Sequence, residues 1–418
     1  MRIAIVGGGA AGFFCAINLK EMNPACEVTI FEKSKKVLAK VEVSGGGRCN
    51  CTNSFASVSD LSQVYPRGHR LLKRLFKTFD YHDAYEWFER HGVRLVTQDD
   101  DCVFPASQDS HTIINLFLAE ARRHHIEIRT QSKIESLEEL SEFDRVVITT
   151  GGMQGNLSPL APFPSKARLP VAFHLSPLNS PVPSLFTFSI EDSALRALMG
   201  TVVEGATAYI PGTNFRATGP LLITHWGMSG PAILKLSSYA ARELHDHNYQ
   251  MPLAINWISG KVDHQEAAKT EIIKLQAQSA MQKVSKVRPF NLPSRLWSYL
   301  IDKALGERAQ NRWQNLNQKE LNRLVNTLCN DNYQIAGRAA FKDEFVTCGG
   351  IDLSAVNPNT LESKHLPHVY FAGEVLDIDG ITGGFNFQAA WTTAYTVARA
   401  ISQQSRTPAK RLGYLYDS

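Results

Sequence analysis

The stretch "RIAIVGGGAAG", Arg2 to Gly12, decides the fold of the N-terminal region. Its apolar start, Ile3 to Val6, is typical of a buried parallel strand. Glycines follow at the spacing G-x-G-x-x-G, at Gly7, Gly9 and Gly12. The next residues, "FFCAINLKEM", predict a helix, and "EVTIFEK" at 27–33 predicts a second strand. This order indicates a βαβ unit with a glycine turn after its first strand.

The glycine turn has the features of a dinucleotide-binding fingerprint. Gly7 permits the tight turn, Gly9 lets the backbone approach a pyrophosphate, and Gly12 lets the helix pack closely on the strand. Glu32 lies twenty residues after Gly12, where a carboxylate that binds ribose belongs. The alternative is a glycine-rich turn without a ligand, which the flanking strands and helix disfavour. The expected contacts are Gly7, Gly9, Ala10, Ala11, Gly12, Glu32 and Lys33.

Two further features favour FAD over NAD as the bound dinucleotide. A second glycine loop follows directly after the second predicted strand, and "FAGE" at 371–374 ends a late buried strand. FAD runs the length of such a domain and would meet both. No second G-x-G-x-x-G follows a strand, so NAD(P)H is expected only as a transient electron donor without a Rossmann domain of its own.

The second glycine loop is "VEVSGGGRCNCTN" at 41–53. Three successive glycines allow positive φ values, so that several amides can face one ligand. Arg48 is suited to pair with a phosphate or to stabilise an anionic flavin. A flexible linker is the alternative.

Cys49 and Cys51 have the spacing C-x-C. In an extended segment these residues share a face but lie too far apart for a disulfide bond, and the spacing of a zinc site is missing. Cys49 is therefore either a packed thiol or a proton donor, and no metal site is predicted.

The composition is that of an ordinary globular protein: 418 residues, 44% hydrophobic, 20% charged and a net charge of +4. Seven scattered cysteines favour a reducing compartment over a disulfide scaffold. The sequence enters a strand at residue 2 without a signal peptide, and no apolar run has the length of a membrane span. We therefore predict a cytoplasmic protein without a membrane partner.

The pattern of elements predicts an α/β fold with a discontinuous doubly wound domain. Its N-terminal part is expected at 1–185 and its C-terminal part at 340–418. A β-rich subdomain is expected at 186–262 and a polar, helical subdomain at 263–339. Many of the prolines lie at 156–186 and mark the first boundary.

The sequence resembles the bacterial BaiN/RdsA-like NAD(P)/FAD-dependent oxidoreductases along its whole length. The similarity lies in "IVGGGAAG", "KVEVSGGGRCNCTN", "ITHWGMSGPAILKLSS", "VTCGGIDL" and "TLESKHLPHVYFAGEVLDIDGITGGFNFQAAWTTAY". It implies a GR2-type, Rossmann-like FAD-binding domain with an inserted β-barrel-like subdomain and a helical subdomain. The segment 151–170 departs from the family pattern after its "TGG" strand.

The resemblance also implies chemistry and site residues. Family members reduce a carbon–carbon double bond conjugated to a carbonyl, in bile acid intermediates or in a uridine of ribosomal RNA, and others are described as amine oxidases. The helix opened by "GITGGFNFQ" would direct its amides at the flavin carbonyl where negative charge gathers. The further FAD contacts are expected at Lys40, Ser44, Gly45, Gly46, Arg48, Cys49, Asn50, Ile134, Thr150, Gly151, Gly373, Glu374, Asp377, Gly384, Phe385 and Asn386.

Three residues are candidates for catalysis: Cys49, His225 and Asp377. Asp377 would bind the ribityl hydroxyls or face the substrate. His225 lies in "THWGMSGPAIL", which is either a capped helix start, with Ser229 as N-cap and Pro231 in the first turn, or a wall over the flavin with His225 as an acid.

The stretch "RGHRLLKRLFK" predicts a basic helix face. It is either a solvated surface or a contact for the phosphate backbone of RNA. The expected enzyme reduces uridine in 23S rRNA to dihydrouridine, or a small enone. The alternatives are an amine oxidase and a non-catalytic FAD-binding scaffold, and the oligomeric state stays open. The candidate RNA contacts are Arg67, Arg70, Lys73, Arg74 and Lys77.

Overall fold

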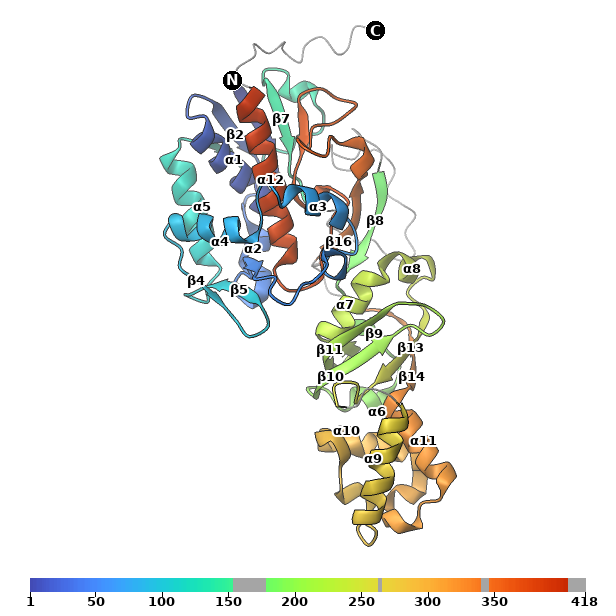
Figure 1. Cartoon of the computed structure of the whole chain (residues 1–418). Helices are drawn as coiled ribbons and strands as arrows, with labels where there is room; N and C mark the ends of the chain where they lie inside the picture. Colours follow the sequence, from blue (N-terminus) through green and yellow to red (C-terminus); the bar gives the residue numbers. More distant parts are fainter. Residues whose placement is uncertain (153–177, 262–264, 340–345, 405–418) are drawn as a thin grey trace. The chain divides into compact units, whose positions relative to one another are not determined.

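The computed structural model describes residues 1–152, 178–261, 265–339 and 346–404 (Figure 1). The chain divides into two compact units. Unit 1 comprises Met1–Val182 and Val346–Ser418, and unit 2 comprises Pro183–Phe345. Most of the proline-rich boundary at 156–186, and most of the family departure at 151–170, lie outside the described residues.

Unit 1 is built on a five-stranded sheet in the order β17-β7-β1-β2-β6. Every neighbouring pair is parallel, as the apolar runs predict. Because the C-terminal strand β17 pairs with β7, the two ends of the chain build one sheet. The strands are β1 (Arg2–Val6), β2 (Glu27–Phe31), β6 (Glu127–Arg129), β7 (Arg145–Ile148) and β17 (Val369–Phe371).

The helices of unit 1 pack on one another through aromatic side chains. The helix that follows the glycine turn, α1 (Ala10–Met22), packs against the long C-terminal helix α12 (Phe385–Gln404) and against α5 (His111–Arg123) (Figure 1). Edge and tilted ring contacts join residues from α1, α4 (Tyr81–Arg90), α5 and α12. These rings are Phe14, Trp87, Phe88, Phe117 and Trp391.

Shorter elements of unit 1 complete the domain. Strands β3 (Thr52–Asn53), β5 (Cys102–Pro105) and β4 (Leu95–Thr97) form a small antiparallel sheet, and β16 (Val346–Ile351) pairs with β8 (Leu178–Ser184). The remaining helices include α2 (Ala39–Gly47) and α3 (His69–Leu75). Short 3-10 turns lie at Leu61–Gln63, Glu138–Leu140, Leu353–Ala355 and Gly373–Val375.

Unit 2 contains a seven-stranded antiparallel sheet that curls on itself. Its order is β14-β13-β10-β11-β12-β9-β15. Strands β14 (Asp331–Ile335) and β15 (Gly337–Arg338) are the two edges of this order, yet a single residue separates them in the chain. The edges must therefore approach each other, which gives the predicted barrel-like form. The other strands are β9 (Phe188–Ser189), β10 (Val202–Tyr209), β11 (Arg216–Ile223), β12 (Gly227–Ser229) and β13 (Met251–Asn256).

The predicted helical part is inserted between β13 and β14. It contains α9 (Gln265–Gln278), α10 (Ser294–Leu305) and α11 (Gln318–Cys329), with short turns at Val284–Lys286, Pro289–Asn291, Gly306–Gln310 and Trp313–Asn315 (Figure 1). One apolar core runs from the barrel into these helices. Three shorter helices lie between the strands: α6 (Ser193–Arg196), α7 (Pro231–Tyr239) and α8 (Ala241–Asp246).

One local expectation in unit 2 is wrong by one residue. The N-cap of α7 is Gly230, because Ser229 ends β12 and its hydroxyl accepts a hydrogen bond from Thr187 at 2.7 Å. Pro231 does open the helix, as predicted. Within the described ranges, no helix combines the length and apolarity needed to cross a membrane.

Candidate functional site

The first glycine turn is tight where the fingerprint requires it. Gly7 has a φ of +121°, and its N–H donates to the carbonyl of Phe31 at 2.8 Å. A Cβ on Gly7 would overlap the carbonyl of Thr149, and a Cβ on Gly12 would overlap the carbonyl of Gly7. A Cβ on Gly9, in contrast, would have no described atom within 4 Å. The turn is therefore closed on its protein side and open at Gly9.

Glu32 stands at the end of β2 and is bound to this turn. Its carboxylate accepts the N–H of Gly8 at 2.9 Å and the N–H of Ser34 at 2.8 Å. The carbonyl of Glu32 accepts the N–H of Ser132 at 2.9 Å, which brings the loop that holds half-buried Ile134 to the same strand end. Lys33 is exposed.

The second glycine stretch is partly helical rather than a free loop. Helix α2 includes its glycines, but Ser44 (ψ 148°), Gly45 (φ 57°) and Gly46 (φ 68°) depart from helical geometry. The predicted positive φ values are therefore confirmed. A Cβ on Gly46 would meet no described atom within 4 Å, so a second open backbone surface lies here. The N–H of Leu38, just before α2, donates to Gly8 at 2.9 Å and ties this stretch to the first turn.

Arg48 contacts other residues of unit 1 through its guanidinium. Its guanidinium donates to the carbonyl of Gly45 at 3.1 Å and to the side chain of Gln108 at 3.4 Å. It also lies over the ring of Phe104, 4.3 Å from the centroid. The predicted contact between Arg48 and a phosphate remains a prediction.

The geometry expected for Cys49 and Cys51 is wrong. Cys49 has a φ of 60°, so the segment is not extended there, and the two sulfur atoms lie 3.9 Å apart. Both thiols are free and fully buried. Burial raises the pKa of the Cys51 thiol well above its ordinary value, and the neighbouring Cys49 raises it further. The Cys51 thiol is thus held in its protonated form in close contact with Cys49, and the role of Cys49 as a proton donor stays a prediction.

Glu374 forms a polar junction after β17. It pairs with Lys40 of α2 at 2.7 Å and accepts the N–H of Thr347 at 2.9 Å. Burial raises the pKa of the Glu374 carboxyl, but the Lys40 ammonium outweighs that effect and holds the pKa below its ordinary value. Gly373 precedes it with a φ of +78°. A Cβ there would lie 2.8 Å from the Cβ of Ala11, so β17 meets the first turn at this point.

Thr150 and Gly151 follow β7 at the same end of the sheet. The hydroxyl of Thr150 is a buried atom without a hydrogen-bond partner among the described residues. A buried polar atom normally has a partner, so this hydroxyl indicates a missing one. Gly151 has a φ of +73°, and a Cβ there would lie 3.8 Å from the carboxylate of Glu374.

The N-terminus of α12 is held by hydrogen bonds from the second glycine stretch and its surroundings. In the amide orientation that satisfies its neighbours, Asn50 accepts the N–H of Gly384 at 3.2 Å. Asn386 exchanges two hydrogen bonds with Gly380, at 2.8 and 2.9 Å. The hydroxyl of buried Tyr65 donates to the carbonyl of Phe385 at 2.8 Å. A helix of twenty residues therefore presents its N-terminal end at this point.

An ion pair that the sequence did not predict adjoins this helix end. Arg67 binds Asp379 through two nitrogen atoms; Asp379 is fully buried and the Arg67 side chain is 16% exposed. Burial would lower the pKa of Arg67, but the Asp379 carboxylate raises it. Asp377 accepts the amide of Asn179 at 2.7 Å. The pair of Arg67 with Asp379 spans 312 residues of sequence, so no local pattern predicts it.

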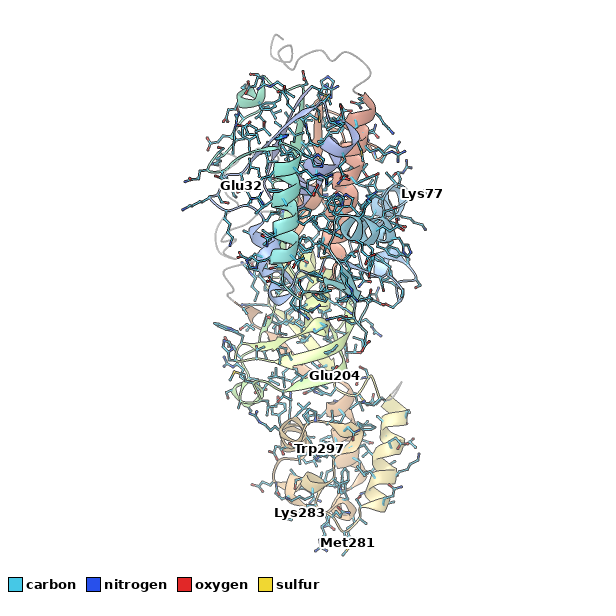
Figure 2. All side chains as sticks on the ribbon, turned by 90° about the vertical axis from the view of Figure 1, so that its left-hand side faces the viewer. Glu32, Lys77, Glu204, Met281, Lys283 and Trp297 are labelled. Carbon is cyan, nitrogen blue, oxygen red and sulfur yellow. The ribbon has the colours of Figure 1, made fainter. Side chains whose placement is uncertain are left out.

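Arg67 therefore does not belong to the exposed basic face that the sequence predicted. The other four cations, Arg70, Lys73, Arg74 and Lys77, are exposed, while Leu71, Leu72 and Leu75 point into unit 1 (Figure 2, Lys77). Arg74 donates to the side chain of Asn359 at 3.0 Å. This amphipathic pattern is the one predicted for α3 and its flanks.

His225 belongs to unit 2, in the turn between β11 and β12. It is exposed and lies 5.0 Å from the ring of Trp226, centroid to centroid. The turn is held by Thr224, whose hydroxyl accepts two backbone N–H groups at 3.2 Å. The role of His225 as an acid stays a prediction.

A histidine–carboxylate group lies elsewhere in unit 1, at Glu21, His91 and Glu120. Nε2 of His91 contacts Glu21 at 2.8 Å, and Nδ1 contacts the carbonyl of Trp87 at 2.7 Å. Burial lowers the pKa of His91 and raises that of Glu21, but their mutual hydrogen bond and charge attraction, together with the other polar contacts of each group, outweigh burial, so the pKa of His91 is raised and that of Glu21 is lowered. An ion pair accounts for this arrangement.

Known proteins and family models match most of the chain. Residues 1–159 match the family model described as "HI0933-like protein Rossmann domain", and residues 182–346 match "HI0933-like protein barrel and H2TH domain". A protein named ribosomal RNA dihydrouridine synthase from Haemophilus influenzae is 27% identical over 96% of this chain and 98% of its own length. The protein of that name from Escherichia coli is 27% identical over 94% and 96%. A 3-dehydro-bile acid delta(4,6)-reductase from Clostridium scindens is 26% identical over 96% and 99%.

Proposed function

From the premise that this chain belongs to the family of HI0933-like proteins, we propose that it reduces a uridine of ribosomal RNA to dihydrouridine. The protein is an FAD-dependent oxidoreductase, and the substrate and NAD(P)H as electron donor are the proposed parts. One observation carries the RNA substrate: the exposed basic face around α3 adjoins the N-terminal end of α12. Arg67 makes this connection, because it precedes α3 in the chain and binds Asp379 just before α12.

The residues of unit 1 fit FAD on structural grounds. The backbone is open at Gly9 and at Gly46, the Thr150 hydroxyl needs a partner, and a helix N-terminus lies at Gly384. An anionic pyrophosphate suits the first turn, because the N-terminus of α1 carries free amides and a partial positive charge. Glu32 is placed to exchange its backbone donors for ribose hydroxyls. We propose that these residues hold the cofactor.

When bound, the flavin supplies hydride transfer between a nicotinamide and an electron-poor double bond. The chain itself supplies electrostatics and position. The positive end of α12 favours negative charge beside Gly384 and Phe385. Lys40 and Glu374 fix the end of β17 against α2, and Arg67 fixes the segment before α12. These contacts keep the site in one geometry.

The proton that completes the reduction needs a donor, and three residues remain candidates. Cys49 is buried against Cys51, Asp377 accepts from Asn179, and His225 lies in unit 2. A Cys49→Ser variant that retains FAD and full turnover would assign Cys49 to packing. A variant that retains FAD but loses turnover, with recovery at higher acid concentration, would assign it to proton delivery.

The substrate is tested with purified protein, NADH or NADPH, and 23S rRNA transcribed without modifications. We expect dihydrouridine, quantified by mass spectrometry of RNA nucleosides, to form only in reactions that contain FAD and a nicotinamide. Reduction of the flavin by NAD(P)H without dihydrouridine would reject the RNA substrate. In that outcome a small enone becomes the substrate to test, since one relative is named as a bile acid reductase.

A further inference from the structure

The helical part of unit 2 carries an excess of positive charge. Residues 265–329 contain eleven Lys or Arg against five Asp or Glu, a net charge of +6, whereas the whole chain has +4. No acidic residue occurs from 272 to 301. A charge excess of this kind points to an anionic partner rather than to a feature of the fold.

Four cations of this part lie on two segments that pair with each other, and we name them the basic patch: Lys283, Lys286, Arg288 and Arg312. Lys283 and Arg312 are partners in an antiparallel bridge. Two backbone hydrogen bonds hold this bridge. The N–H of Val284 donates to the carbonyl of Asn311, and the N–H of Trp313 donates to the carbonyl of Gln282, both at 3.0 Å. Lys283 lies beside Met281, which is 64% exposed, at one end of the helical part (Figure 2).

The basic patch has no carboxylate partner among the described residues. All four of its side chains are exposed. Neighbouring cations of the same part are neutralised, in the pairs Lys274–Glu271, Lys303–Asp331 and Arg308–Glu320. Cations without carboxylate partners on neighbouring segments repel one another, so an anion that approaches them is attracted.

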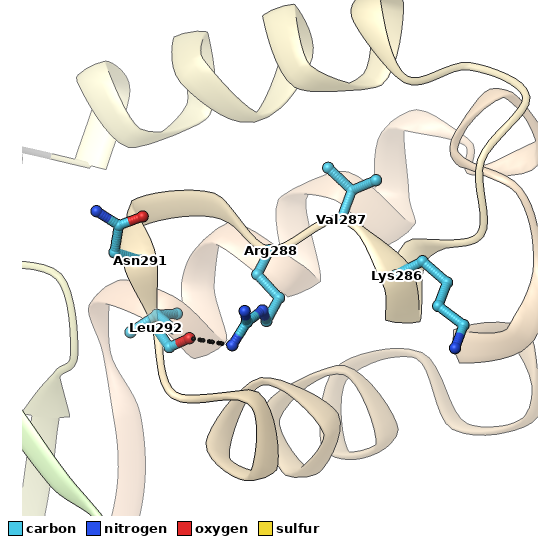
Figure 3. A pocket seen from close by; sticks show the side chains of 5 residues that line it. All are labelled: Lys286, Val287, Arg288, Asn291 and Leu292. Atoms are coloured by element: carbon cyan, nitrogen blue, oxygen red, sulfur yellow. Dashed lines mark hydrogen bonds between the residues drawn. The ribbon is translucent and has the colours of Figure 1, made fainter.

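A hollow of about 340 Å³ adjoins the patch (Figure 3). It is lined by Lys286, Val287, Arg288, Asn291 and Leu292. Arg288 donates one hydrogen bond to the carbonyl of Leu292 at 3.3 Å, so its other guanidinium donors remain for a ligand (Figure 3).

The loop that lines the hollow is anchored by buried side chains. Pro289 and Leu292 are buried, and the indole of buried Trp297 donates to the carbonyl of Val284 at 3.0 Å. Phe290 and Asn291 adopt left-handed φ values of 59° and 52°, which rarely persist without such support. The backbone that carries Lys286 and Arg288 is therefore held in place by its buried neighbours.

We infer that the basic patch binds the phosphate backbone of RNA. This inference rests on the proposed function, because it assigns part of the RNA contact to unit 2. Closely spaced, unpaired Lys and Arg release the counterions of a polyanion, and a guanidinium matches a phosphate with paired donors. Contacts to the backbone position the RNA and carry no sequence information, so the patch holds many RNA sequences alike.

The test uses the full-length protein with FAD and transcribed 23S rRNA as the probe. The variant Lys283→Gln/Lys286→Gln/Arg312→Gln removes three charges. The control Lys274→Gln/Lys319→Gln/Arg323→Gln removes three charges from exposed side chains of the same part. The variant Lys283→Arg/Lys286→Arg keeps the charge. Dissociation constants are measured by filter binding between low and moderate salt, and thermal unfolding confirms that each variant is folded.

We expect the patch variant to bind RNA at least tenfold more weakly at low salt. Its slope of log K against log salt should be less steep by about 2 to 3, since each lost phosphate contact changes the slope by roughly 0.7 to 0.9. The control and the Lys→Arg variant should stay within about twofold of the parent protein. An unchanged slope, or an equal loss in the control, would overturn the inference. The inference would also be overturned if the patch variant lost binding to phosphatidylglycerol vesicles as strongly as it lost binding to RNA. That result would assign the basic patch to lipid.

The binding assay and the chemical assay fail independently. If the patch variant loses RNA binding while the parent protein forms no dihydrouridine, the RNA contact at the basic patch is supported and uridine is rejected as the substrate. If dihydrouridine forms while the patch variant binds RNA like the parent protein, uridine is supported as the substrate and the RNA contact at the basic patch is rejected.

Discussion

The openness of the backbone at Gly9 predicts a variant that folds normally but binds FAD poorly. Gly9 has an extended backbone, with φ −92° and ψ −169°, which alanine adopts without strain. Its added Cβ would meet no described atom within 4 Å. Gly12 is the matched control: there the same Cβ would overlap the carbonyl of Gly7, which is backbone and cannot turn aside.

The expected magnitudes follow from these two geometries. In Gly9→Ala the unfolded chain loses freedom and no native contact is disturbed, so the free energy of unfolding of the apoprotein should stay equal or rise by about 0.4 to 1 kcal/mol. Pressing a methyl group into a fitted pyrophosphate site costs roughly 1 to 3 kcal/mol, the cost of overpacking. The dissociation constant for FAD should therefore rise by about 5- to 150-fold.

Gly12→Ala should show the reverse order of effects. The overlap forces α1 away from the turn, and the apoprotein should lose roughly 1 to 3 kcal/mol of unfolding free energy before any cofactor is added. Urea unfolding of the apoproteins measures stability, and quenching of flavin fluorescence on titration measures the dissociation constant. The two readouts separate loss of the site from loss of the fold.

Two results would refute this reasoning. If apo Gly9→Ala is destabilised by more than about 1 kcal/mol, the space at Gly9 is not open in the native protein. If Gly9→Ala binds FAD as tightly as the parent protein, the pyrophosphate does not approach this turn. Only the second result would place the cofactor away from the fingerprint.

Two further predictions concern stability. Arg67→Met should lower the free energy of unfolding in urea by about 3 to 5 kcal/mol, because buried Asp379 loses its countercharge. The control Arg70→Met, at an exposed position, should change it by no more than about 0.5 kcal/mol. Equal effects of the two substitutions would contradict a buried ion pair between Arg67 and Asp379. For Glu21 and His91, the lowered and raised pKa values mean that their ion pair stabilises the fold fully between the ordinary values 4.5 and 6.5, and less as pH rises through the raised pKa of His91 or falls through the lowered pKa of Glu21. Glu21→Gln should therefore destabilise the protein most near about pH 5.5 and less at about pH 9, and a loss independent of pH would show that the pair does not titrate as inferred.

The sequence by itself determined the βαβ start, the dinucleotide turn and the class of the fold. Gly12 is informative because its requirement is local: a Cβ there would overlap the carbonyl of Gly7 in the same turn. The apolar runs determined the parallel strands for a similar reason, since each strand carries its burial pattern within a few residues. Neither inference needs a distant partner.

Tertiary structure alone decided how the rest of the site is held. Asp379 meets Arg67 across 312 residues, and Glu374 meets Lys40 across 334, so no local pattern could signal either pair. The contact of Cys49 with Cys51 is close in sequence, yet it depends on a left-handed residue whose φ of 60° no cysteine pattern predicts. The basic patch also needed the fold, because the bridge that joins Lys283 to Arg312 is a contact between separate loops. The number of charged residues and the spacing of glycines can be read from the sequence. Which countercharge or neighbour each of these residues meets depends on how the backbone folds between distant positions.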